Sequence, residues 1–194
     1  MNFTYFMSHL QGRVQLNEQW QAEIKNRCQL VEIQKGGVLL YPNEICRHVY
    51  FVCSGFFRMF SLENELDETI DFAATDDFLT CIDTFFSQKN GKEGIICERD
   101  GVLLKLNIND ILALQDLSTD FLRLCNAILQ EYLILINREK NVFRTANATQ
   151  KYLYLCRRYP GIANLVSHKH IASYLGITPP TLSILLKGLL RKTN

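Results

Sequence analysis

No aspartate or glutamate occurs between Lys140 and Asn194, the last 55 residues of the chain. This stretch contains nine lysines and arginines, whereas the first 139 residues contain twelve basic residues and all 20 acidic ones. The formal net charge of +1 is therefore the sum of about −8 in residues 1–139 and about +9 in residues 140–194. Positive charge gathered at one end indicates that this end meets a polyanion.

The chain also lacks any apolar run approaching the roughly twenty residues that a membrane span needs, so we expect no membrane partner. Residues Met1 to Leu10 contain no basic segment followed by an apolar core and a cleavage site. We therefore find no signal peptide there and expect a cytoplasmic protein. With 194 residues, 47% of them hydrophobic and 21% charged, the composition is that of a globular protein with one large or two small domains.

Redox and metal motifs built from cysteine are absent as well. No CxxC pair occurs, and an iron–sulfur cluster would need several cysteines close together. An odd number of scattered cysteines among apolar neighbours is typical of buried thiols in a reducing compartment. The seven cysteines are Cys28, Cys46, Cys53, Cys81, Cys97, Cys125 and Cys156.

An enzyme is the main alternative from another class, because some small barrels, the cupins, hold a catalytic metal through several histidines and a carboxylate. Only His48, of four histidines, lies in the strand-rich part of this chain. His168 and His170 are two apart on an expected helix and so point to different faces. No nucleophile elbow, phosphate loop or pair of catalytic carboxylates is present. We expect no metal site, no cofactor and no enzymatic activity.

Short apolar, β-branched and aromatic runs fill the chain from Cys28 to Leu106. Turn signals such as Gly36-Gly37, Ser54-Gly55 and Asp100-Gly101 separate them. Many short strands at this spacing predict a β-sandwich or barrel. A helical pattern precedes the strands over residues 1–27, and a short helix is expected over 76–87.

A long amphipathic helix is expected over residues 119–143. Apolar residues recur in it at intervals of three and four from Phe121 to Ile136, which gives a broad apolar stripe. A long helix between a β-domain and a basic domain is a natural dimerisation interface between two copies of a chain. The stripe alternatively packs only on the β-domain of its own chain.

The basic end has the spacing of a helix-turn-helix. One helix is expected over 145–159, ended by Pro160-Gly161, and a second over 168–175 behind the N-cap Ser167. Gly176 ends the second helix, and a third begins after Thr178 and runs to about residue 191. A small residue, a glycine and then apolar residues at these offsets let two helices meet steeply across a short turn. The inward-facing residues are Ile171, Ala172, Leu175, Ile177, Leu182 and Leu185.

Four segments carry a resemblance to a family. They are 35–40 (KGGVLL), 49–58 (VYFVCSGFFR), 163–179 (ANLVSHKHIASYLGITP) and 181–183 (TLS), of which the last two are the more specific. The chain resembles Crp/Fnr-family transcriptional regulators over nearly its whole length. The resemblance implies an α+β fold with an N-terminal double-stranded β-roll (a cupin-like jelly roll), a long dimerisation helix and a C-terminal helix-turn-helix domain. It divides the chain into 1–118, a cyclic-nucleotide-binding-like sensor domain; 119–143, the dimerisation helix; and 144–194, the DNA-binding domain.

The effector region departs from the family pattern. Cyclic-AMP-responsive members place the phosphate on a Gly-Glu pair at a helix N-terminus and on a later Arg-Ser pair. Leu79-Thr80 stands in the first position here, residues 89–94 contain no Arg-Ser, and Asp76, Asp77 and Asp83 would repel a phosphate. We expect no ordinary cyclic-AMP binding and an unidentified small-molecule effector, if any. The candidate pocket residues are Phe78, Leu79, Thr80, Cys81 and Lys92.

The recognition helix departs as well, because it offers few side chains for base edges. Ile184 stands where related sequences often have arginine, and only Ser183 and Lys187 have hydrogen-bonding groups on the expected groove face. Affinity for duplex DNA should then rest on phosphate contacts and depend strongly on salt. The candidate DNA-binding residues are Ser167, Lys169, Thr178, Pro179, Pro180, Thr181, Ser183, Ile184, Lys187, Arg157 and Arg158.

The sequence thus predicts a homodimeric DNA-binding transcriptional regulator whose β-roll senses an effector. The alternative is a sensor or protein-interaction module that has lost sequence-specific DNA binding, since the apolar run from Ile184 to Leu190 would suit a partner protein.

Overall fold

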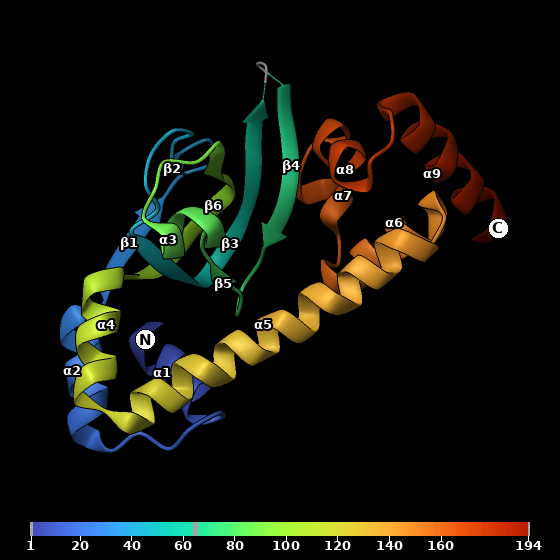
Figure 1. The fold of residues 1–194 in the computed structure, drawn as a ribbon. Helices are drawn as coiled ribbons and strands as arrows, with labels where there is room; N and C mark the ends of the chain where they lie inside the picture. Colours follow the sequence, from blue (N-terminus) through green and yellow to red (C-terminus); the bar gives the residue numbers. More distant parts are fainter. Residues whose placement is uncertain (1, 64–65, 194) are drawn as a thin grey trace.

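The computed structural model describes residues 2–63 and 66–193, with the side chains of residues 191–193 excepted. Figure 1 shows a twisted antiparallel sheet on one side, a long helix running diagonally past it, and a group of short helices against one sheet edge. This is an α+β architecture, as the sequence predicts. Within the described residues, no helix is both long enough and apolar enough to cross a membrane.

The sheet consists of antiparallel strands in the order β1-β6-β3-β4, with β2 pairing with β6 and β5 pairing with β3. Its inner face holds a core built around Phe57, Ile95 and Leu103. The short helix α3 closes one side of this roll. The bounds are β1 Gln29–Ile33, β2 Val38–Leu40, β3 His48–Glu63, β4 Leu66–Ala73, β5 Phe78–Leu79, α3 Ile82–Ser87 and β6 Glu93–Asn107.

The turns expected at Ser54-Gly55 and Asp100-Gly101 are wrong. Strands β3 and β6 are continuous through these positions, and the pairing register between them shifts there. Gly55 has φ +102°, and a Cβ on it would lie 2.6 Å from the Cα of Gly101. The two glycines therefore let the strands cross closely in a bulge, which bends a long ribbon instead of ending it.

Helices surround the lower part of the roll. The α1 and α2 helices cover residues Asn2–Gln11 and Glu18–Arg27, and α4 spans Ile108–Leu117. Ser118 then caps α5, Thr119–Thr145, by accepting from the Phe121 N–H at 3.2 Å. The long helix thus ends two residues beyond the expected boundary. Phe6, Phe51 and Leu124 form the centre of a second core where α1, the sheet and α5 meet.

Four helices complete the chain: α6 Ala148–Arg158, α7 Ile162–Leu165, α8 His168–Leu175 and α9 Pro179–Thr193. Helix α6 begins later than predicted because Asn147 and Gln150 form a capping box that fixes its start. The bounds of α8 and the start of α9 agree with the sequence prediction.

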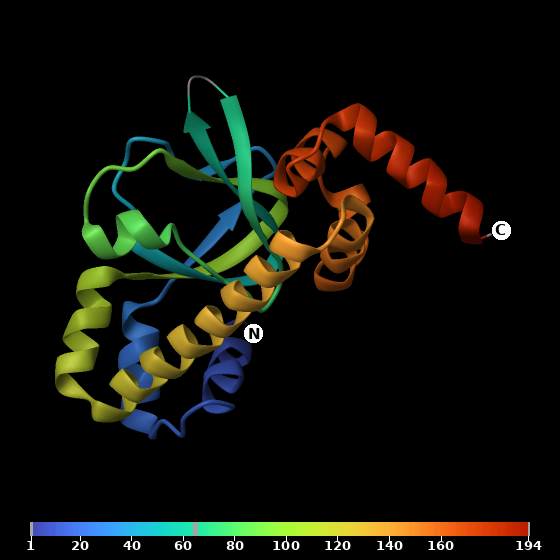
Figure 2. The ribbon, with the colours of Figure 1, turned by 45° about the vertical axis from the view of Figure 1, so that its right-hand side comes forward.

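Of these helices, α8 packs against β4, whereas α9 extends away from the sheet (Figures 1 and 2). Phe72 of β4 and Phe56 of β3 share a buried cluster with Tyr159 and Tyr174. The hydroxyl of Tyr159 also donates to the carbonyl of Phe72. The C-terminal helices therefore share a hydrophobic core with the sheet of the same chain.

Candidate nucleic-acid interface and effector cavity

The turn between α8 and α9 is held by local hydrogen bonds. Gly176 adopts φ +68° and ends α8, and the N–H of Ile177 donates to the carbonyl of Ala172 at 3.0 Å. Thr178 caps α9, because its hydroxyl accepts from the N–H of Thr181 at 3.3 Å. The three residues between the helices are therefore fixed in one geometry.

The inner face of this helix pair is closely packed. Ile171, Ala172 and Leu182 have no exposed surface, and Leu175 has almost none. The small Ala172 lies where the two helices approach, as the sequence predicts. Leu185 and Ile177 are partly buried against the same cluster.

The opposite face is open. Ile184 is 73% exposed, although it is a large apolar side chain. The hydroxyl of Ser183 donates to the carbonyl of Pro179 at 3.1 Å, so one of the few polar groups on this face is engaged locally. Helix α9 projects away from the body of the molecule (Figure 2). The exposed candidate residues are Arg157, Ser167, Lys169, Thr178, Pro179, Pro180, Thr181, Ser183, Ile184 and Lys187.

Arg158 is half-buried and does not share this exposure, and its role in binding DNA phosphates stays a prediction. Its guanidinium donates to the hydroxyl of Tyr159 at 2.7 Å and lines a cavity under the long helix. Burial lowers the pKa of Arg158, but Tyr159, Asp71 and Asp77 outweigh burial and raise it further above its already high ordinary value. Arg158 therefore joins α6 to the β-roll instead of facing solvent beside Arg157.

The cavity lies between the β-roll, α1, α4 and α5, and its volume is about 290 Å³. Phe78, Leu79 and Thr80 line it, so the structure brings three of the five candidate effector residues together. Helix α5 closes one side with Leu124, Cys125, Ile128, Leu129, Tyr132 and Leu135. The sequence offered no signal for the contribution of α1, because its contact with the cavity depends on how the N-terminal helix docks.

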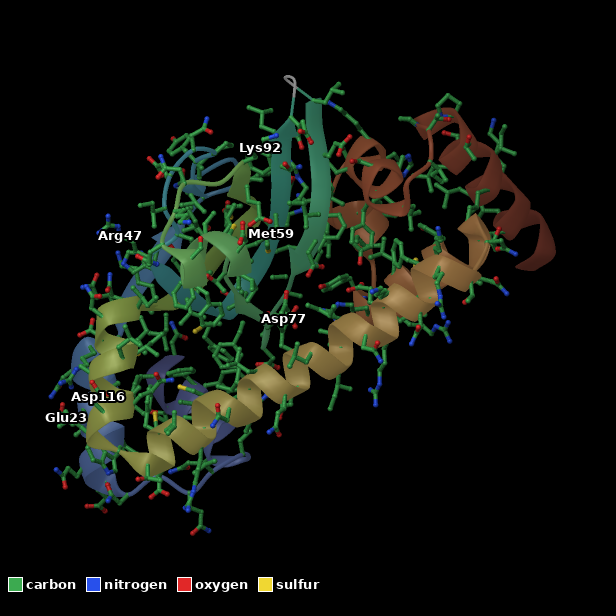
Figure 3. The ribbon with its side chains drawn as sticks, viewed as in Figure 1. Glu23, Arg47, Met59, Asp77, Lys92 and Asp116 are labelled. Atoms are coloured by element: carbon green, nitrogen blue, oxygen red, sulfur yellow. The ribbon has the colours of Figure 1, made fainter. Side chains whose placement is uncertain are left out.

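The other two candidate effector residues lie elsewhere. Cys81 is fully buried and belongs to the core of the roll rather than to the cavity wall. Lys92 forms an exposed ion pair with Glu63, with Nζ and Oε1 2.6 Å apart. Figure 3 shows Lys92 far from Asp77, which lines the cavity. Lys92 therefore offers no positive charge to a molecule in this cavity.

Carboxylates dominate the charges around the cavity. Asp71, Asp76, Asp77 and Glu131 line it, against Arg13 and Arg158. Arg13 is already engaged, because its Nη2 lies 2.7 Å from Oε2 of Glu131. With Arg13 and Glu131 paired, Arg158 remains beside three carboxylates, those of Asp71, Asp76 and Asp77, and this excess of negative charge opposes the phosphate of a cyclic nucleotide.

A polar cluster that the sequence does not predict lies beside this cavity. The hydroxyl of Tyr174 donates to Glu139, and both residues face Asp71. Burial raises the pKa of Asp71 to about 7, with Glu139 adding to the effect and Arg158 opposing it. The cluster joins β4, α5, α6 and α8, and nothing in the sequence spacing of these residues predicts that they meet.

Residues 2–63 and 66–193 contain no group of three or more histidine, cysteine, aspartate or glutamate side chains arranged to hold a metal ion. His48 is paired with Asn107, with Nε2 and Nδ2 3.4 Å apart. The cysteines that the structure describes are all free thiols, and Cys46, Cys81 and Cys97 are buried.

No protein-family model and no curated protein sequence matches the chain. Solved structures do match its fold. FixK2 from Bradyrhizobium japonicum aligns with a TM-score of 0.71 at 17% identity, over 86% of either chain. A protein from Eubacterium rectale assigned to the Crp/Fnr family of transcriptional regulators gives 0.70 at 15% identity, over 91% of this chain and 85% of that one.

A third match is CLP from Xanthomonas campestris, a global regulator that responds to c-di-GMP. It aligns with a TM-score of 0.68 at 14% identity, over 91% of this chain and 93% of that one. The chain therefore has the fold of Crp/Fnr-type regulators, and the predicted resemblance is confirmed at the level of the fold.

Proposed function

We propose that this protein is a homodimeric, DNA-binding transcriptional regulator of the Crp/Fnr type. Its sensor domain would be residues 1–118, its dimerisation helix 119–143 and its DNA-binding domain 144–194. The observation that carries this proposal is the exposed outer face of the α8–α9 pair, in a segment without a single acidic residue. Such a face suits the major groove, flanked by basic side chains that meet phosphates.

The exposed stripe on α5 supports the homodimer. Leu122, Leu129, Leu133 and Ile136 recur at intervals of seven, four and three, and each is between 37% and 63% exposed. These residues lie on the side of α5 that the β-roll leaves largely uncovered, although Leu129 also borders the cavity. A second α5 would bury this stripe and place two α9 helices on one DNA duplex.

The test is binding to random-sequence duplex DNA across a salt series. We expect affinity to fall steeply with salt and to fall further for Lys169→Ala and Lys187→Ala. Lys35→Ala is the matched control, because Lys35 is exposed on the sensor domain instead. Salt-independent binding, or no binding at low salt, would contradict the proposal.

A protein-interaction module is the second candidate, because Ile184 and Leu190 are 73% and 69% exposed on α9. Absence of DNA binding in the salt series would favour this candidate. Ile184→Lys separates the two, since an added positive charge strengthens non-specific DNA binding but disrupts an apolar protein contact.

A further inference from the structure

We propose that the cavity between α1, the β-roll and α5 binds an uncharged, largely apolar small molecule. We propose further that this molecule is the effector, a second statement that rests on the function proposed above. The cavity volume of about 290 Å³ lies near the lower end of the range for small-molecule sites. That volume suits one fused ring system or a medium-length acyl chain.

The side chains that form the cavity walls determine that the ligand is largely apolar. Phe6 and Leu10 of α1, Leu79 and Phe85 of the roll, and Leu124 of α5 are all buried and all line it. An apolar molecule that displaces water from such walls gains the hydrophobic free energy of both surfaces. A strongly hydrated molecule would lose its water without gaining matching hydrogen bonds.

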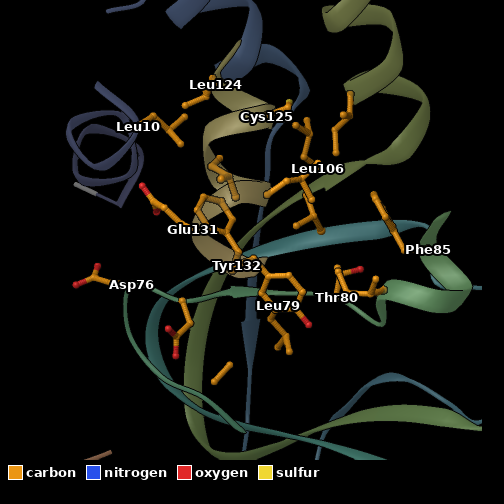
Figure 4. A pocket seen from close by; sticks show the side chains of 18 of the residues that line it. Leu10, Asp76, Leu79, Thr80, Phe85, Leu106, Leu124, Cys125, Glu131 and Tyr132 are labelled. Carbon is orange, nitrogen blue, oxygen red and sulfur yellow. The ribbon is translucent and has the colours of Figure 1, made fainter. Parts of the chain in front are cut away.

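The rim determines the ligand's charge. Figure 4 shows Asp76 and Glu131 at one end of the cavity, with Phe85 at the other. Asp76 accepts from the hydroxyl of Tyr5 at 2.5 Å, and Glu131 is paired with Arg13. An anion would therefore meet an excess of negative charge, while the carboxylates already have partners and do not require a cation. An uncharged molecule fits both conditions.

A ligand bound in this cavity would affect the position of the DNA-binding helices through two direct contacts. The inner face of α5 forms one wall, and Arg158 of α6 lines the same space while bonding to Tyr159. Tyr159 in turn donates to the carbonyl of Phe72 in β4. A ligand that presses on these groups can shift the position of α6 and of the helices that follow it.

The test uses two fluorescent probes with one skeleton. N-phenyl-1-naphthylamine is uncharged, and 1-anilinonaphthalene-8-sulfonate adds a single sulfonate. We expect saturable binding of the uncharged probe, with the sulfonate bound at least tenfold more weakly. Equal affinities, or tighter binding of the sulfonate, would overturn the proposed ligand class.

Two variants locate the probe. Ile82→Trp adds a large ring at a half-buried position that lines the cavity, and should reduce affinity for the uncharged probe at least tenfold. Ile70→Trp is the matched control on the exposed side of β4, outside this cavity, and should leave affinity unchanged. Asp76→Asn should tighten the sulfonate several-fold, and asparagine tolerates the φ of +76° found there.

The proposal is wrong if Ile82→Trp leaves the affinity for the uncharged probe unchanged. It is also wrong if Asp76→Asn leaves the affinity for the sulfonate probe unchanged. These titrations contain no DNA, so they fail or succeed independently of the proposed function. Adding saturating uncharged probe to the DNA titration tests the effector role. A change in DNA affinity of threefold or more supports it, and an unchanged affinity with the cavity filled contradicts it.

Discussion

The hydroxyl of Ser173 on α8 accepts a hydrogen bond from the backbone N–H of Thr69, 2.9 Å away in the edge strand β4. An edge strand exposes unpaired backbone donors, and here a side chain of the helix-turn-helix satisfies one of them. The contact spans 104 residues of sequence and ties the proposed DNA-binding domain to the sheet of the same chain.

Ser173→Ala removes this contact while leaving α8 intact. We expect the free energy of unfolding to fall by about 1 kcal/mol, because the Thr69 N–H loses its partner. Urea denaturation measures the change. Ser183→Ala is the control, since its hydroxyl bonds only within exposed α9, and equal losses in both variants would contradict this account.

Arg58 holds the outer face of the roll together. It is 2% exposed and donates to Asp67 at 2.5 and 3.0 Å and to Glu98 at 2.8 Å. Arg58→Met should cost about 3–5 kcal/mol, because two carboxylates lose their shared partner. Lys92→Met breaks the exposed pair with Glu63 and should cost under about 1 kcal/mol in the same denaturation assay. Similar costs for the two variants would argue against the special position of Arg58.

Gly55 is required by the crossing of β3 and β6. Gly55→Ala places a Cβ 2.6 Å from Gly101 at a φ of +102°, so we expect loss of several kcal/mol or of soluble protein. Gly36→Ala has a similar φ of +84° but nothing within 4 Å of the added Cβ. It should cost only about 1 kcal/mol. Comparing the thermal unfolding of both variants separates the cost of the steric clash at Gly55 from the cost of a positive φ alone.

Asp71 makes stability depend on pH. Its pKa is raised from 3.8 to about 7 by burial, so the folded protein keeps a proton that the unfolded chain releases above pH 4. Stability from this group therefore falls as pH rises from about 4 to about 7 and stays lowered above that range. Glu139 and Asp77 reinforce the shift, and Arg158 opposes it.

Asp71→Asn removes that titration. Relative to the parent protein, the variant should gain stability progressively between pH 4.5 and pH 7.5 in urea unfolding. Asp120→Asn, in an exposed pair with Arg123, should show no such gain. A constant difference between the Asp71 variant and the parent across this window would refute the assignment.

Leu133 tests the proposed dimer. It is 63% exposed on α5, and Leu133→Arg should shift the protein toward monomer in analytical ultracentrifugation. DNA affinity should fall with it, because paired recognition helices bind together. Leu66→Arg adds the same charge at a similarly exposed position on β4 and should leave the oligomeric state unchanged. A parent protein that is monomeric at micromolar concentration would contradict the dimer.

The start and end of α8 and the start of α9 could be predicted from sequence because Ser167, Gly176 and Thr178 act within a few residues of their own position. The same holds for the buried face of Ile171 and Leu182, since helical spacing alone assigns it. The proposed effector region is predicted only in part, because Leu79 lines the cavity, whereas Lys92 lies outside it and pairs with Glu63.

The sequence by itself determined the succession of a strand-rich part, a long helix and a basic helical end, the capped turn between α8 and α9 and the division of charge, because each depends on local spacing or on composition. Only the tertiary structure decided that Gly55 and Gly101 form a crossing instead of two turns, that Arg158 faces Asp71, and that α1 completes an apolar cavity. These features depend on contacts between segments distant in sequence, and the packing of the whole chain sets such contacts.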